Sequence, residues 1–125
     1  MPLLLAIMEL GGYPNLMDVY RQAGYEVVTA NSMRKAIALM KKRQPAVIVA
    51  EFNYQSDFRD RTSSLESLLA TRQTRCPAAR VVVFYETEQA GHLDKVLGRF
   101  PVDRTLAFPI VPAAVAAALE GLAAD

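Results

Sequence analysis

Apolar runs alternate with helical patterns along the whole chain. Consecutive apolar residues are typical of strands buried on both faces of a parallel sheet, and they predict strands over 3–8, 25–29, 45–51, 81–85 and 105–108. Apolar residues at helical spacing predict the intervening helices, over 14–23, 32–43, from a cap within 62–64 to about 75, 90–100 and 113–123. Strands that alternate with amphipathic helices form a parallel sheet with helices on both faces. We therefore predict a single three-layer α/β domain over residues 1–125.

Capping residues support several of these boundaries. Gly24 is expected to end the first helix, and Asn31 or Ser32 to cap the second. A cap at Thr62, Ser63 or Ser64 is expected for the third helix, with Glu66 completing a capping box. The run 41–43 is basic and lies in the last turn of the second helix, where cations complement the helix dipole. We prefer this interpretation of the run to a phosphate site.

Composition and charge then exclude several functional classes. A hydrophobic content of 52% with 22% charged residues is typical of a globular domain and not of a disordered chain. The net charge of +1 gives no electrostatic basis for nucleic acid or an anionic membrane as the main partner. The first apolar run is too short for a membrane span and lacks the features of a signal peptide. The single Cys76, a core or loop residue, fits a reducing compartment, so we expect a cytoplasmic protein.

Motifs for most cofactors and for hydrolysis are absent. Gly11-Gly12 lacks the spacing of a dinucleotide turn and the Gly-Lys-Ser/Thr of a nucleotide loop, and no Gly-x-Ser-x-Gly elbow occurs. His92 is the only histidine, so histidine-based metal sets cannot form, and we expect it at the surface. We expect neither a cofactor nor a metal ion.

The third predicted strand carries the most informative pattern. Pro45 begins a continuous apolar run that ends in Glu51, at the carboxyl edge where α/β proteins place their sites. The five-fold strand–helix order, this Pro-x-[apolar]4-acid pattern and the Phe108-Pro109 step after the last strand resemble receiver domains of two-component response regulators. The resemblance covers nearly the whole chain. It implies a flavodoxin-like (βα)5 fold with strand order 2-1-3-4-5.

The resemblance also implies a degenerate site. In that family an acidic pair ends the first strand and holds Mg²⁺, and an Asp at the end of the third strand takes the phosphoryl group. A Ser or Thr after the fourth strand and a Lys after the fifth bind the phosphoryl oxygens. An aromatic residue on the fifth strand commonly reports the switch. Here other residues occupy these positions, in chain order Met8 with Glu9, Glu51, Tyr85, Thr105 and Phe108, the last followed by Pro109.

These replacements argue against phosphorylation. A phenylalanine cannot supply the cation that offsets phosphoryl charge, and a thioether is a poor Mg²⁺ ligand. Glu51 also carries one more methylene than Asp, which misplaces its carboxylate. We predict that the domain is not phosphorylated and is not an enzyme, with Glu51 as a relic or, alternatively, as an imitation of the phosphorylated state. We expect Glu51 near Glu9; candidate partners are Tyr85, Arg59, Arg61 and Arg104.

Two functional hypotheses follow. The first is a pseudo-receiver that acts through a protein partner, an output domain or homodimerisation. The resemblance implies an interface on the fourth helix, fifth strand and fifth helix, with candidates His92, Lys95, Val96, Arg99, Leu106, Val115 and Leu119. The alanine-rich fifth helix is expected to expose small residues there. The alternative is a small-molecule-binding domain whose crevice is lined by Glu9, Tyr13, Glu51, Tyr54, Tyr85 and Phe108. Acid–base catalysis by the two carboxylates ranks third.

Overall fold

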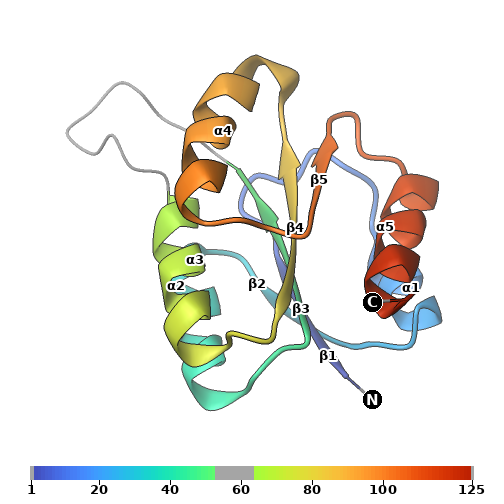
Figure 1. Cartoon of the computed structure of the whole chain (residues 1–125). Helices are drawn as coiled ribbons and strands as arrows, with labels where there is room; N and C mark the ends of the chain where they lie inside the picture. Colours follow the sequence, from blue (N-terminus) through green and yellow to red (C-terminus); the bar gives the residue numbers. More distant parts are fainter. Residues whose placement is uncertain (1, 53–63, 125) are drawn as a thin grey trace.

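Five strands and five α-helices alternate along the part of the chain that the structure describes, in the predicted order. The computed structural model describes residues 2–52 and 64–124 (Figure 1). The strands are β1 (Leu3–Ile7), β2 (Glu26–Ala30), β3 (Val47–Glu51), β4 (Arg80–Tyr85) and β5 (Arg104–Ala107). The helices are α1 (Met17–Gln22), α2 (Met33–Lys42), α3 (Ser64–Arg75), α4 (Ala90–Arg99) and α5 (Pro112–Ala124), with a short 3-10 turn at Thr87–Gln89 before α4.

The strands pair side by side in the order β2-β1-β3-β4-β5, and every pair is parallel. This order confirms the predicted flavodoxin-like (βα)5 fold. Helices α2, α3 and α4 cover one face of the sheet, and α1 and α5 cover the other (Figure 1). None of the described helices is long and apolar enough to cross a lipid bilayer.

Two separate cores explain why β3 is continuously apolar. Ile48 and Ala50 point into the core shared with α2, α3 and α4. Val47 and Val49 point into the core shared with α1 and α5. Successive residues of the strand point to opposite faces of the sheet, and helices cover both faces. Every residue of β3 is therefore buried, and Glu51 is its only polar residue. The strand therefore delivers that carboxylate to the carboxyl edge of the sheet.

Local side-chain bonds set the helix boundaries. The Ser32 hydroxyl accepts a hydrogen bond from the Lys35 amide at 3.1 Å, which confirms the predicted cap of α2. Helix α1 begins later than predicted, because the Asn15 side chain accepts from the Met17 amide at 3.0 Å and holds a turn ahead of the helix. The predicted caps at Thr62 and Ser63 lie outside the described residues.

Cys76 is a core residue, as interpreted from the sequence. Its thiol is buried and donates to the Met40 carbonyl at 3.8 Å. Burial raises the pKa of the Cys76 thiol, and the nearby Arg72 and Arg75 oppose this shift. A thiol held in its neutral form is a weak nucleophile, so its place here is structural.

Candidate functional site

Glu51 is buried at the carboxyl edge of the sheet. Only 2% of its surface is exposed, and it is the one charged side chain in the buried set of the described chain. A carboxylate removed from water is stable only when hydrogen-bond donors or cations replace the lost solvent. The neighbours of β3 are β1 and β4, so the segment that follows β1 passes over the end of β3. That segment supplies donors to Glu51.

The loop after β1 covers the carboxylate with backbone amides. The Leu10 amide donates to Glu51 Oε1 at 3.0 Å, and the Gly11 amide lies 3.4 Å from Oε1 and 3.3 Å from Oε2. Gly11 and Gly12 have φ values of +72° and +84°, a left-handed conformation that glycine adopts without steric cost. These two residues turn the loop back across the end of β3. Gly11 and Gly12 do not form a nucleotide-binding motif. They form a turn whose backbone amides bind the carboxylate of Glu51.

Tyr13 completes the covering of Glu51. Its hydroxyl donates to Glu51 Oε2 at 2.7 Å, a short charge-assisted hydrogen bond. Its ring meets Phe84 edge-to-face, with centroids 5.2 Å apart, and lies 6.0 Å from the ring of Phe108. These contacts hold the ring in place on its apolar side. We refer to Glu51, Leu10, Gly11 and Tyr13 as the Glu51 site.

The two tyrosines near Glu51, Tyr13 and Tyr20, remain protonated. Burial, the hydrogen bond to Glu51 and the negative charge of Glu51 together raise the pKa of Tyr13 far above its ordinary value. Burial, with a smaller effect of the same charge, also raises the pKa of Tyr20. Ionisation of either phenol next to a buried carboxylate would place two negative charges in one apolar site. The Tyr13 hydroxyl therefore donates to Glu51 throughout the neutral pH range.

The sequence predicted the position of Glu51 but not its partners. The hydroxyl that bonds Glu51 is that of Tyr13, whereas Tyr85 is half-buried and its backbone carbonyl accepts from the Phe108 amide at 2.9 Å. Arg104 is exposed and donates to the Asp103 carbonyl at 2.8 Å, so this candidate partner was also wrong. The remaining candidates, Arg59 and Arg61, and the predicted crevice residue Tyr54 lie outside the described residues.

The other positions that the resemblance assigns to the receiver site differ in how far they are exposed. Met8 is 39% exposed and does not fill the carboxyl edge. Glu9 is half-buried, and Thr105 and Pro109 are exposed. Phe108, at the position that the resemblance assigns to a lysine, packs its ring against Tyr13. In residues 2–52 and 64–124, no three His, Cys, Asp or Glu side chains form a group that could hold a metal ion.

Three of the predicted interface residues face the core instead of the surface. Val96, Val115 and Leu119 are at most 4% exposed, because they lie on the sides of α4 and α5 that pack against the sheet. They cannot contact a partner, and this part of the prediction was wrong. The other four differ in accessibility: Lys95 and Arg99 are exposed, and His92 and Leu106 are half-buried. Arg99 also pairs with Glu66 of α3 at 3.3 Å.

The outer side of α5 does expose small residues, as expected. Ala113, Ala114 and Ala117 are exposed, and Val111, just before the helix, is 50% exposed. Together with Lys95, these residues belong to the accessible part of the face formed by α4, β5 and α5.

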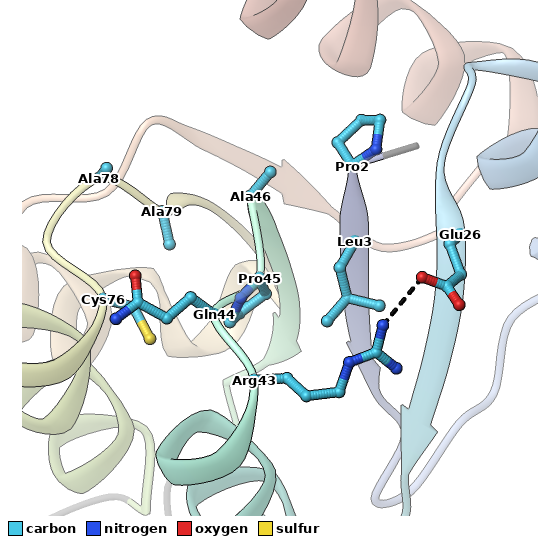
Figure 2. Close-up of a pocket in the computed structure, with 10 residues that line it drawn as sticks. All are labelled: Pro2, Leu3, Glu26, Arg43, Gln44, Pro45, Ala46, Cys76, Ala78 and Ala79. Carbon is cyan, nitrogen blue, oxygen red and sulfur yellow. Dashed lines mark hydrogen bonds and ion pairs between the residues drawn. The ribbon is translucent and has the colours of Figure 1, made fainter.

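A pocket lies at the amino edge of the sheet, away from Glu51. Figure 2 shows this pocket, which has a volume of about 590 Å³ and contains the Glu26–Arg43 ion pair at 2.9 Å. Its walls come from the starts of three strands and from the turn between α3 and β4: Pro2, Leu3, Glu26, Arg43, Gln44, Pro45, Ala46, Cys76, Ala78 and Ala79. None of the predicted site residues lines it. At the carboxyl edge, Tyr13 occupies space that the small-molecule hypothesis assigned to a ligand.

Solved receiver domains share this fold. The Vibrio cholerae chemotaxis protein CheY4 matches with a TM-score of 0.75 and 22% identity, over 97% of this chain and 98% of that one. A response regulator receiver domain protein from Clostridium thermocellum gives 0.72 and 14%, over 97% and 93%. A response regulator from Burkholderia pseudomallei, whose structure contains a phosphorylated aspartic acid and a calcium ion, gives 0.62 and 20%, over 99% and 72%. No protein-family model and no curated protein matches the chain. At these identities the likeness shows the receiver fold.

Proposed function

We propose that this domain is a receiver-like signalling module that acts without phosphorylation, through contacts with other proteins. One observation carries the proposal. The carboxylate at the position of the receiver phosphoacceptor is 2% exposed and is covered by the domain's own loop. The structure of the Burkholderia pseudomallei neighbour contains a phosphorylated aspartic acid, whereas in this chain the strand at the expected phosphoacceptor position ends in Glu51.

The chemistry of phosphoryl transfer supports the same conclusion. An attacking carboxylate must present one oxygen to the phosphorus atom, but both oxygens of Glu51 accept hydrogen bonds from the loop after β1. A hydrogen bond to a charged group contributes about 1.5–3 kcal/mol, so freeing an oxygen costs energy before any reaction begins. Phe108 and Met8 add neither the cation nor the metal ligand that would offset phosphoryl charge. On these grounds we also propose that the domain is not an enzyme.

Glu51 has a structural role in this proposal. Its carboxylate anchors the loop after β1 to the end of β3. The loop is thereby held in one conformation without a phosphoryl group. An imitation of the phosphorylated state would use the positions of Tyr85 and Phe108 to bind the carboxylate. Instead, Phe108 contacts the ring of Tyr13, and the donors come from the first loop. We therefore favour a relic that was reused as an anchor.

The surface proposed for partners is the face formed by α4, β5 and α5. The exposed residues of this face include Lys95, Thr105, Val111, Ala114 and Ala117. The face thus combines exposed cations with small and apolar residues, a mixture that suits a helix of another protein or a second copy of this domain. A monomeric mass that does not change with protein concentration would contradict the homodimer and leave a different protein as the partner.

A phosphorylation assay tests the proposal. The protein is incubated with Mg²⁺ and acetyl phosphate, and its intact mass is measured directly afterwards. We expect no phosphoryl adduct, while the Burkholderia pseudomallei response regulator, treated in parallel, serves as the positive control. The Glu51→Gln variant reports any modification elsewhere on the chain. An adduct that forms on the wild type and disappears in this variant would overturn the proposal.

A further inference from the structure

The exposed side of α2 carries cations that the described chain leaves unneutralised. The stretch 33–43 contains five Lys or Arg residues and no Asp or Glu, although the whole chain has a net charge of only +1. Arg43 pairs with Glu26 at 2.9 Å. The other four are exposed and form no ion pair or side-chain hydrogen bond with residues 2–52 or 64–124: Arg34, Lys35, Lys41 and Lys42. A net positive surface therefore lies along one helix.

Two of these cations are placed against the helix dipole. Lys41 and Lys42 lie in the last turn of α2, where positive charge is favourable. Arg34 and Lys35 lie in the first turn, which has no acidic residue, and there the dipole disfavours positive charge. Stability of α2 alone accounts for the last-turn pair but not for the first-turn pair. A charge that breaks a local rule without a gain inside the fold points to a contact outside it.

An apolar groove runs between these cations. It has a volume of about 640 Å³ and lies along α2, with Ser67 of α3 on its far side. Met33, Ile37 and Ala38 form its apolar wall, and Arg34, Lys41 and Lys42 stand at its two ends. We call this surface the α2 groove. The acid next to Ser67 in the sequence, Glu66, pairs with Arg99 of α4 and does not neutralise the groove.

We propose that the α2 groove binds an acidic amphipathic helix of a partner protein. The apolar wall is complementary to apolar side chains spaced three and four residues apart on such a helix. The cations at both ends of the groove are complementary to carboxylates that flank this apolar stripe. Helix α2 has 10 residues, so it can line roughly three turns of a bound helix. A nucleic acid or a lipid surface would use the cations but would not need the apolar wall.

This inference does not depend on the face formed by α4, β5 and α5. In Figure 1, α2 covers the opposite side of the sheet from α5. A domain that binds through the α2 groove could also bind a second protein through α5. The two surfaces can be tested separately by matched charge reversals.

The test uses a synthetic helical peptide as the probe. The fluorescein-labelled peptide is about 15 residues long, roughly four helical turns, with leucines on one face and glutamates on both flanks. Binding is followed by fluorescence anisotropy at low and high salt, and by amide chemical shifts of the isotope-labelled protein. We expect binding that weakens with salt and shift changes concentrated in 33–43. A peptide of the same composition with its leucines scattered around the helix should bind about tenfold more weakly.

Matched variants locate the site. The double reversal Arg34→Glu with Lys42→Glu replaces one cation at each end with a carboxylate, and Ala38→Glu places a charge on the apolar wall. All three positions are exposed, so the substitutions do not disturb the core. Each variant is expected to weaken binding about tenfold or more. Lys95→Glu reverses one charge on the exposed side of α4, half the charge change of the double reversal, and should leave the affinity unchanged. Urea unfolding of every variant checks that it remains folded.

Several results would overturn the inference. One is a wild-type protein that does not bind the peptide at low salt. Another is equal binding of the scattered peptide, which would show charge attraction without use of the groove. A third is a loss of affinity in Lys95→Glu as large as that in the double reversal. Binding of anionic vesicles or duplex DNA in place of the peptide would assign the cations to a different class of partner and would also contradict it.

Discussion

Replacing Tyr13 with phenylalanine measures how firmly the loop after β1 is held to Glu51. The substitution removes one hydroxyl group and keeps the ring that packs against Phe84 and Phe108. The lost hydrogen bond is 2.7 Å long and ends on a carboxylate that is 2% exposed. Hydrogen bonds to charged groups contribute about 1.5–3 kcal/mol. We expect Tyr13→Phe to lower the free energy of unfolding by about 2 kcal/mol.

Urea unfolding provides the assay for this substitution. With a slope of about 1.5–2 kcal/mol per M for a domain of this size, the midpoint should fall by roughly 1 M while the slope stays constant. Tyr85→Phe is the matched control, because it removes a hydroxyl from a half-buried tyrosine at the same edge of the sheet. Its effect should stay within about 0.5 kcal/mol.

A double-mutant cycle with Glu51→Gln isolates the pair. If the Tyr13 hydroxyl acts through Glu51, the two substitutions should couple by about 0.5–3 kcal/mol. Equal midpoints for Tyr13→Phe and Tyr85→Phe would refute the reasoning. So would effects of Tyr13→Phe and Glu51→Gln that simply add.

Two further outcomes follow from the same region. The pKa values of Tyr13 and Tyr20 are raised in the folded state, so above pH of about 10 the unfolded chain binds fewer protons and stability falls as the pH rises. Absorbance titration should show these two of the five tyrosines ionising only as the domain unfolds, and a single common transition at the ordinary pKa would contradict this. Gly11→Ala should destabilise the domain by about 1–2 kcal/mol, because its φ of +72° is unfavourable for alanine. Gly98→Ala, in helix α4 with open space around it, should be neutral or stabilise by up to about 1 kcal/mol, and equal urea midpoints for both variants would count against this reasoning.

The fold could be predicted because its main signals are local. The uninterrupted apolar run that ends in Glu51 requires helices on both faces of the sheet, and Ser32 caps α2 within three residues of its partner. The partners of Glu51 could not be predicted in this way. Tyr13 lies 38 residues away in the sequence, and it reaches Glu51 only because Gly11 and Gly12 adopt left-handed conformations. A glycine pair permits this turn without requiring it.

The error at the predicted interface has a different origin. The resemblance indicated whole elements, and the candidates chosen from them include residues on the buried sides of α4 and α5, such as Val96, Val115 and Leu119. The spacing in α5 contained the missing information. Val115, Leu119 and Leu122 recur at intervals of four and three residues, which marks the buried stripe and leaves Ala113, Ala114 and Ala117 exposed. Helical spacing would therefore have separated core from surface on α5.

The two edges of the sheet affect how this domain can assemble. Strands β2 and β5 lie at the ends of the strand order, and each begins with an exposed charged residue, Glu26 and Arg104. An added strand would have to align its backbone with these edges and desolvate their charges, which disfavours sheet extension between chains. Growth by edge-to-edge pairing, the usual route to β-aggregation, is thus opposed at both ends of the sheet. We therefore expect any partner to bind at a helix face instead of a sheet edge.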